Sequence, residues 1–256
     1  MVQTKIMPDR VEITVITKSS LRSHTGLEHL LNAFESIKGF TPTHWGLDER
    51  APNPYNRNQL LATVSTFKSD FYLPGIQRKQ APRYKAYFSA RNEGLNYVSV
   101  EFGTSLRQKD FRSVFALGDA LAKEIEAEFG FVHPVWLEGS QEYCASGKIT
   151  ADELQKYGPT PVCAYTWFGS DLVKMIGREC LLNSGAIIKD TPWGGVRLDL
   201  VENPWESDVE TLSSHQFSVM KNLESSGVFG DYTKVLEYKP GANWKPISHQ
   251  TLLEKV

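Results

Sequence analysis

The sequence lacks the features that would place the chain in a membrane or in an oxidising compartment. No apolar run approaches the roughly 20 residues that a transmembrane helix needs. The N-terminal segment MVQTKIMPDR has no apolar core of the kind found in signal peptides. The cysteines are few, odd in number and widely spaced, which is typical of reduced thiols: Cys144, Cys163 and Cys180. We therefore expect a cytoplasmic protein with no membrane partner.

Sequence signatures of metal, phosphate and covalent chemistry are also missing. No CxxC pair occurs and no two histidines stand at i, i+4, so the spacing argues against zinc. Gly194-Gly195 lacks the patterns of phosphate-binding loops and is expected between two strands, which favours a turn. No GxSxG elbow or kinase motif is present. We expect no cofactor, no metal and no catalytic residue. A Cys–His nucleophile or a site assembled from distant residues leaves no such signature, so an enzyme is kept as an alternative.

Excess charge of either sign is absent as well. The chain has 28 basic and 30 acidic residues, a formal net charge of −2, and therefore no general attraction to nucleic acid or anionic membrane. One local basic-aromatic patch interrupts this balance, formed by Arg78, Lys79, Arg83 and Lys85 with Tyr84 and Tyr87. Single-stranded nucleic acid suits such a surface, but the balanced charge favours a solvated loop. We expect no nucleic-acid partner.

Amphipathic stretches predict several helices. Apolar residues recur at helical spacing in residues 27–37, 60–67, 111–129 and 212–223. A shorter helix is expected at residues 171–176. Capping boxes, in which Ser or Thr precedes Glu by three residues, predict helix starts at Thr25, Thr150 and Ser207.

Runs of β-branched and aromatic residues predict strands between the helices. The best candidates are residues 11–16, 84–89, 97–102 and 131–137, the last interrupted by Pro134. Residues 187–200 predict a hairpin around Gly194-Gly195 in which the period of two buries one face. Residues 72–83, rich in proline and basic side chains, predict a loop. Hairpins with helices between them indicate an α+β fold with a mainly antiparallel sheet.

The length allows one large domain or two small ones. The chain has 256 residues, of which 41% are hydrophobic and 23% charged, ordinary values for a globular protein with a substantial core. No composition shift or repeat forces a boundary. We expect a single α+β domain over residues 1–256, with residues 139–161 as the weakest internal join.

Tryptophans beside carboxylates form the most suggestive candidate site. The residues are Trp193, Glu202, Trp205, Glu206 and Asp208. Tryptophan supplies contact area and carboxylates steer a basic partner, so the group suits protein binding. A structural alternative has equal weight: Trp205 pins its loop to the core, and the acids favour the N-terminus of the following helix.

Short motifs around this group carry a resemblance to a known family. They are Thr191-Pro192-x-Gly194-Gly195, an alternating strand, Glu202, the residues from Trp205 to Asp208, and a helix that ends Leu223-x-x-Ser226-Gly227. Together they resemble the C-terminal half of the bacterial immunity protein 52 family. The order of elements in the first half is similar too, with Ala90-Arg91-Asn92-Glu93-Gly94 in its hairpin. The sequence departs from the family in the tail from Tyr232 and in the size of Trp205, and a related type VI immunity family is the alternative.

The resemblance implies a protein that binds and neutralises a cognate toxin and performs no catalysis. The partner would be that protein toxin, with the tryptophan and carboxylate group as its contact surface; the oligomeric state is unknown. Two other functions stay open, an enzyme with a dispersed site and an antiphage or regulatory binding module.

Overall fold

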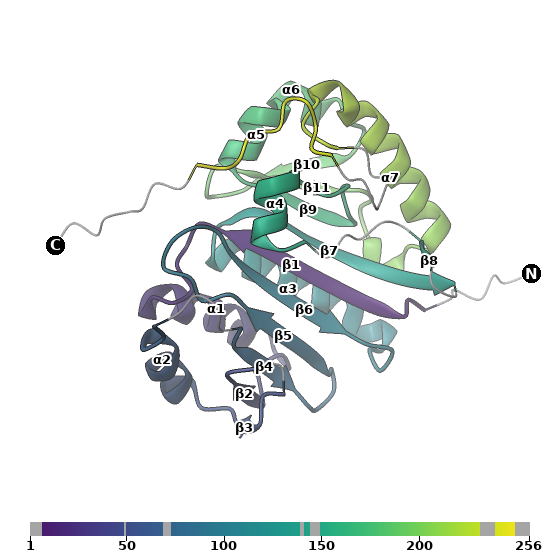
Figure 1. Cartoon of the computed structure of the whole chain (residues 1–256). Coiled ribbons are helices and arrows are strands. Elements are labelled where there is room, and N and C mark those ends of the chain that lie inside the picture. The colour runs from purple at the N-terminus through teal and green to yellow at the C-terminus, as the bar shows by residue number, and fades with distance from the viewer. Residues whose placement is uncertain are drawn as a thin grey trace, which may run out of the picture.

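An antiparallel sheet runs through the molecule in the computed structural model, which describes residues 7–48, 50–68, 73–138, 141–143, 149–230 and 239–248 (Figure 1). The strands are β1 (Arg10–Thr17), β2 (His44–Gly46), β3 (Asn53–Pro54), β4 (Gly75–Arg78), β5 (Tyr84–Phe88), β6 (Asn96–Phe102), β7 (Ala127–Glu138), β8 (Gln141–Tyr143), β9 (Tyr165–Phe168), β10 (Ile187–Asp190) and β11 (Val196–Asp199). Their order across the sheet is β10-β11-β9-β7-β1-β6-β5-β4-β2-β3, and β8 pairs with β7 off this path. The predicted α+β class and antiparallel sheet are confirmed.

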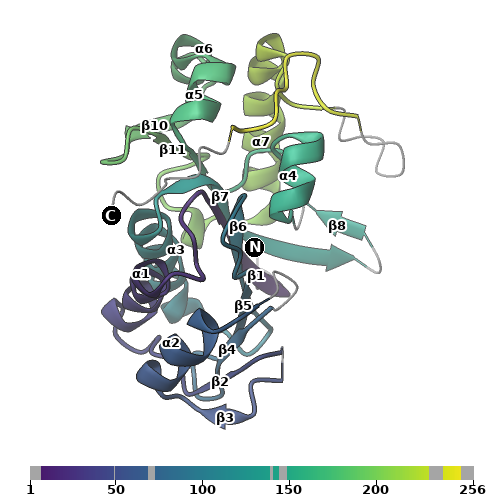
Figure 2. The same cartoon turned by 60° about the vertical axis from the view of Figure 1, so that its left-hand side comes forward.

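Helices cover both faces of this sheet. They are α1 (His24–Ser36), α2 (Arg57–Ser65), α3 (Phe111–Glu124), α4 (Ala151–Tyr157), α5 (Ser170–Ile176), α6 (Arg178–Leu182) and α7 (Val209–Leu223). Figure 2 shows α1 and α3 on one side of the central strands and α4 and α7 on the other. In the described part of the chain, every helix is too short or too polar to cross a membrane.

Strand β1 is central because its side chains are apolar and β-branched. It lies between β6 and β7, where Ile13 pairs with Val100 on one side and Val132 on the other. Every residue from Val11 to Thr17 is buried, which is the environment that suits such residues. The strand predicted at residues 11–16 is confirmed.

The third predicted helix ends earlier than its apolar pattern indicated. Helix α3 stops at Glu124, and Glu126 turns the chain with a φ of 50°. Phe129, expected on the helix, is in β7, a longer strand than the predicted 131–137. Pro134 does not interrupt β7, because β9 pairs only as far as Val132 and β8 only from Trp136. No ladder on that side needs the N–H that proline lacks.

Residues 75–78 were expected in a loop but form β4. This strand pairs with β5 and β2, and the Ile76 side chain is fully buried. The sequence has no strand signal there because Pro74 and Pro82 flank a segment with little β-branched character. Tertiary pairing therefore overrides local propensity.

Of the three predicted capping boxes, one is present in the structure. The capping box at Thr150 and Glu153 is present. Helix α1 is instead capped by Ser23, whose side chain accepts from the Gly26 N–H, and α7 by Asp208, which accepts from the Thr211 N–H. Both predicted boxes were wrong, since another polar side chain near the predicted start takes the cap. Cys144, His249 and part of the predicted join, residues 139–140 and 144–148, lie outside the described residues.

Candidate functional site

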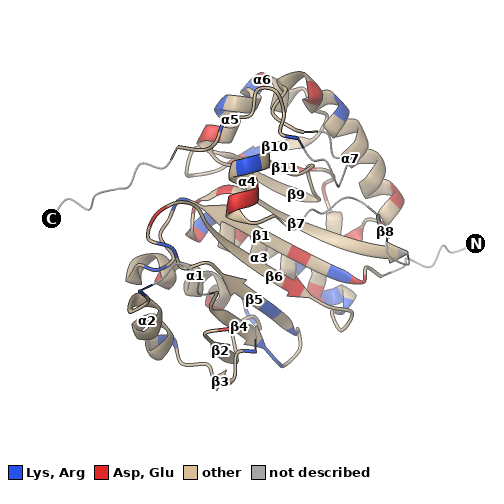
Figure 3. Ribbon diagram, in the orientation of Figure 1, with Lys and Arg blue, Asp and Glu red and all other residues tan. Residues whose placement is uncertain are grey.

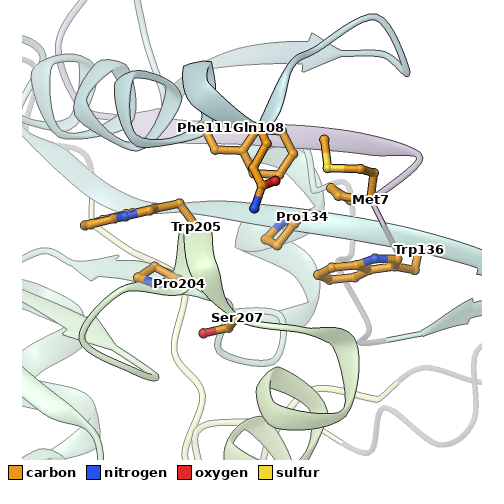
Figure 4. Close-up of a pocket in the computed structure, with 9 residues that line it drawn as sticks. Met7, Gln108, Phe111, Pro134, Trp136, Pro204, Trp205 and Ser207 are labelled. Carbon is orange, nitrogen blue, oxygen red and sulfur yellow. The ribbon is translucent and has the colours of Figure 1, made fainter. Parts of the chain in front are cut away.

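The strongest candidate site lies at one end of the sheet, where β7 ends, β9 begins and β11 ends. The loop that follows β11 contains a short helical turn, Pro204–Glu206. It places Trp205 at a small hollow, with Trp136 on the opposite side and Pro134 between the two rings (Figure 4). The hollow is lined by Met7, Pro8, Gln108, Phe111, Pro134, Trp136, Pro204, Trp205 and Ser207. We call the hollow, together with Glu202, Glu206 and Asp208, the Trp205 face.

Trp205 is held by aromatic contacts and is half-buried. Its ring meets Phe115 edge-on at 5.7 Å between centroids and Tyr165 at 6.5 Å. The Arg112 guanidinium lies 5.8 Å from the ring centroid. Such contacts fix the orientation of a ring that is partly open to solvent. Trp205 therefore both pins the loop and presents contact area, so the two alternatives considered for it are compatible.

The hollow is too small for a substrate. Its volume is about 10 Å³, room for roughly one water molecule. Small-molecule sites usually enclose about 300–1,000 Å³. A shallow depression between aromatic and proline side chains suits the tip of one side chain from a protein partner.

Carboxylates lie next to the lining residues along the chain, on the loop and at the start of α7. Glu202, Glu206 and Asp208 are exposed. Neither Glu202 nor Glu206 forms an ion pair with a described residue, whereas Asp208 holds the N-terminus of α7 through a 2.8 Å hydrogen bond from the Thr211 N–H. The two glutamates thus offer negative charge that the fold itself does not use.

Trp193 lies at the opposite end of the sheet. Its Nε1 donates to the Ala127 carbonyl at 3.0 Å, at the first residue of β7. Pro134 in the hollow is seven residues farther along the same strand, about 23 Å at the usual rise of a strand. The structure brings Glu202, Trp205, Glu206 and Asp208 together and leaves Trp193 apart from them.

A buried ionic network supports the Trp205 face from behind, and sequence reasoning missed it. Arg197 contacts Asp119 of α3 and donates to Asp199 at 2.7 and 2.9 Å. Its guanidinium also lies 4.0 Å from the centroid of the Tyr165 ring. Lys189 gives Asp199 a second cation at 2.7 Å. The predicted alternation over residues 187–200 buries only one face of the strand, yet the Asp199 side chain, which alternates with the apolar Leu198 and Leu200, is fully buried as well.

Catalysis would need a cluster of metal-ligating or nucleophilic side chains at the site. No group of three His, Cys, Asp or Glu side chains among the described residues has the geometry of a metal site. Cys163 is buried and contacts the Pro161 carbonyl, and Cys180 contacts Ser225. Among the described residues, neither a histidine nor a cysteine lines the hollow.

Glu128 is a buried carboxylate away from the Trp205 face whose pKa is raised. It is 5% exposed, and its Oε2 lies 3.2 Å from Lys18 Nζ, which also contacts Asp171. Burial raises the pKa of the Glu128 carboxyl above its ordinary value of 4.5, and Lys18 counteracts that shift. The group holds α5 against β7 and does not line the hollow, so its shifted pKa reflects packing.

This shift predicts a pH dependence of stability. The folded state binds the Glu128 proton more tightly than the unfolded chain does. The protonated carboxyl therefore contributes to the free energy of unfolding at low pH, and this contribution is lost as pH rises through the folded pKa. We expect Glu128→Gln to gain stability relative to the natural protein between about pH 4 and pH 7. Urea denaturation across this pH range measures the difference in the free energy of unfolding between the two proteins.

Asp152→Asn is the control of opposite sign. A hydrogen bond from Arg91 lowers the pKa of Asp152, so its contribution is present above the unfolded pKa and is lost as pH falls. Asp152→Asn should lose stability relative to the natural protein as pH rises. A constant difference between Glu128→Gln and the natural protein at all pH values would contradict the assignment for Glu128.

Comparisons with known proteins give a structural likeness and no family. No family model and no curated protein matches the chain. A solved structure described as Pseudomonas aeruginosa T6SS protein PA0821 superposes with a TM-score of 0.50 at 11% sequence identity. The superposition covers 86% of this chain and 78% of that one. At this identity the likeness concerns the fold alone: the chain is similar in fold to a type VI secretion system protein.

Proposed function

We propose that this protein is an immunity protein that binds a cognate interbacterial toxin and neutralises it without catalysis. The observation that carries the proposal is the Trp205 face: a fixed, half-buried tryptophan at a small apolar hollow, with Glu202 and Glu206, which pair with no described residue, on the same loop. An interface of this kind combines a desolvated anchor with charges that steer a basic partner.

Two further observations support the proposal. The similar fold belongs to a protein described as a T6SS protein, and such systems deliver toxins between bacteria. The resemblance to the immunity protein 52 family points to the same function, and it is carried partly by Glu202 and the residues from Trp205 to Asp208. Many toxins that attack nucleic acid are basic, because their substrate is a polyanion, and a carboxylate-bearing inhibitor gains association rate against them.

Co-expression tests the proposal. The gene for the cognate toxin should lie next to the gene for this protein, and we expect this protein to restore growth of cells that express the toxin. A catalytically inactive toxin and an unrelated toxin of similar size are the controls. Failure to restore growth, with both proteins folded and expressed, would overturn the proposal.

Within this function, Trp205→Ala should weaken toxin binding by about 2 kcal/mol or more, mainly through faster dissociation, because the ring is the anchor of the face. Changing Glu202 and Glu206 together to Gln should slow association and reduce its salt dependence. Surface plasmon resonance at two salt concentrations measures both effects.

Matched variants separate binding from folding. Trp244 is also half-buried, with its Nε1 on the Gln155 carbonyl, and lies on the C-terminal segment, so Trp244→Ala is the tryptophan control. Glu179 and Glu224, both exposed, give the control pair of Glu→Gln changes. If Trp205→Ala lowers the melting temperature but leaves the affinity of the folded protein unchanged, Trp205 is structural and the interface lies elsewhere. Trp193→Ala tests whether the partner extends to the other end of the sheet.

The enzyme and the antiphage or regulatory module are the remaining alternatives. No observation at the Trp205 face favours a substrate, since its hollow holds about one water molecule. A regulatory module would use the same face for another protein, and the growth assay separates it from an immunity protein.

A further inference from the structure

A second and larger hollow lies at the same end of the sheet as the Trp205 face. Its volume is about 300 Å³ and it is bounded by the β4–β5 hairpin and the end of β6. The lining residues are Gln77, Arg78, Lys79, Arg83, Tyr84, Lys85, Glu101, Gly103 and Ser105. We call it the basic groove. It contains the basic residues of the patch recognised in the sequence.

The charge of the groove is strongly positive and is not neutralised by the fold. Four cationic side chains line it against one carboxylate, that of Glu101. Figure 3 shows basic residues along β5 and the adjoining hairpin. None of these four cations forms an ion pair with a described residue, although arginines elsewhere do: Arg10, Arg50, Arg57, Arg91, Arg107, Arg178 and Arg197. The whole chain has a net charge of −2, so this excess of positive charge is a local feature of the groove.

Arg78 gives the groove a fixed donor. Its Nη1 donates to the Thr41 carbonyl at 2.9 Å, which holds the guanidinium against the segment that precedes β2. Its Nε is buried and has no hydrogen-bond acceptor among the described residues. Lys79, Arg83 and Lys85 are exposed and free to close on a bound anion.

The aromatic residues of the patch are not available to stack on bases. Tyr84 is 3% exposed, its ring is stacked on Phe34 at 5.4 Å, and its hydroxyl donates to the Phe40 carbonyl at 2.6 Å. Tyr87 packs edge-on against Tyr97 at 6.4 Å. Proteins that bind single strands combine cations with exposed rings. Among its described residues the groove has cations but no exposed aromatic ring, which favours carboxylates over a nucleic acid.

We propose that the basic groove binds an acidic segment of a protein partner, with carboxylates against Arg78, Arg83 and Lys85. The groove and the Trp205 face lie three strand spacings apart, about 14 Å from β5 to β7. The segment between β6 and α3 joins them, since Ser105 lines the groove and Gln108 lines the hollow. A partner that covers this end of the sheet meets both surfaces. The inference rests on the groove alone and is independent of toxin neutralisation.

Fluorescence anisotropy with the full chain and a dye-labelled hexaglutamate peptide tests the proposal. We expect saturable binding at about 50 mM salt that weakens at about 200 mM, as charge interactions do. Arg83→Glu with Lys85→Glu should weaken it about tenfold or more, because two of the four cations are reversed. Both side chains are exposed, and circular dichroism confirms that the variant is folded.

The control is Lys221→Glu with Lys245→Glu, which changes the net charge equally at exposed positions outside the groove. This variant should bind the peptide as the natural protein does. A labelled hexathymidylate of similar charge separates the two classes of anion. No peptide binding, equal weakening in both variants, or tighter binding of the oligonucleotide than of the peptide would each overturn the proposal.

Discussion

Phe115→Ala is expected to lower the free energy of unfolding by about 3–5 kcal/mol, the cost of leaving a large cavity in a packed core. Phe115 is 1% exposed and lies in the middle of the buried stripe of α3. Its ring contacts Tyr165 at 5.0 Å and Trp205 at 5.7 Å, so the cavity opens directly behind the Trp205 face. Urea denaturation measures the loss, and we expect weaker partner binding by the folded variant as well.

Phe34→Ala is the matched control for this prediction. Phe34 is fully buried on α1 and stacks on Tyr84 at 5.4 Å, in the half of the sheet that does not contact Trp205. It should cost about 3–5 kcal/mol in stability for the same reason, with no change in binding at the Trp205 face. A loss below about 1 kcal/mol for either variant would mean that the corresponding helix face is not part of the core.

Arg197→Met is expected to cost about 3–5 kcal/mol, because it removes one partner from a buried ionic network. Asp199 is fully buried and accepts two hydrogen bonds from Arg197. Lys189 stays in contact with Asp199, so the carboxylate keeps one of its two cations. Asp119 loses its contact with Arg197 too. Burial raises the pKa of the Asp119 carboxyl, and Arg197 counteracts this shift in the natural protein. Chemical denaturation near neutral pH measures the effect.

The double variant Arg197→Met with Asp199→Leu separates a lost contact from an uncompensated charge. Removing both partners should recover part of the stability lost in the single variant, since the buried carboxylate is then gone. A single variant that loses less than about 1 kcal/mol would show that Arg197 contributes little net stability. A double variant no more stable than the single one would show that the unpaired charge of Asp199 is not the cause of the loss.

Local patterns in the sequence predicted those parts of the fold that depend on near neighbours. The apolar spacing of α1 and the capping box at Thr150 need only residues a turn or two apart, and both are present. Phe129 continues the helical spacing of α3, yet it pairs with Phe168 in the sheet. Whether Phe129 joins the helix or the sheet is decided by its pairing with β9, a strand distant in the sequence. Local periodicity therefore cannot predict which of the two forms. The same holds for β4, which forms because β2 and β5 are on either side.

The candidate site was predictable in its residues and not in its geometry. Trp205 and its carboxylates are close in sequence, so they stay together in the structure. Trp193 is near them in sequence too, but it precedes β11 and Trp205 follows it, so this strand separates the two tryptophans. Arg197 and Asp199 were visible as a charged pair in a strand. Their burial depends on Asp119 of α3, which no local pattern connects to them.

Titration calorimetry of this protein against the inactivated toxin encoded beside it measures directly whether the two proteins form a complex. We expect a saturable complex with a dissociation constant of about 10 nM or lower, as tight inhibitory interfaces give. We also expect Trp205→Ala to weaken this binding and Trp244→Ala to leave it unchanged. No detectable binding at micromolar concentrations, with both proteins shown to be folded, would contradict the proposed function.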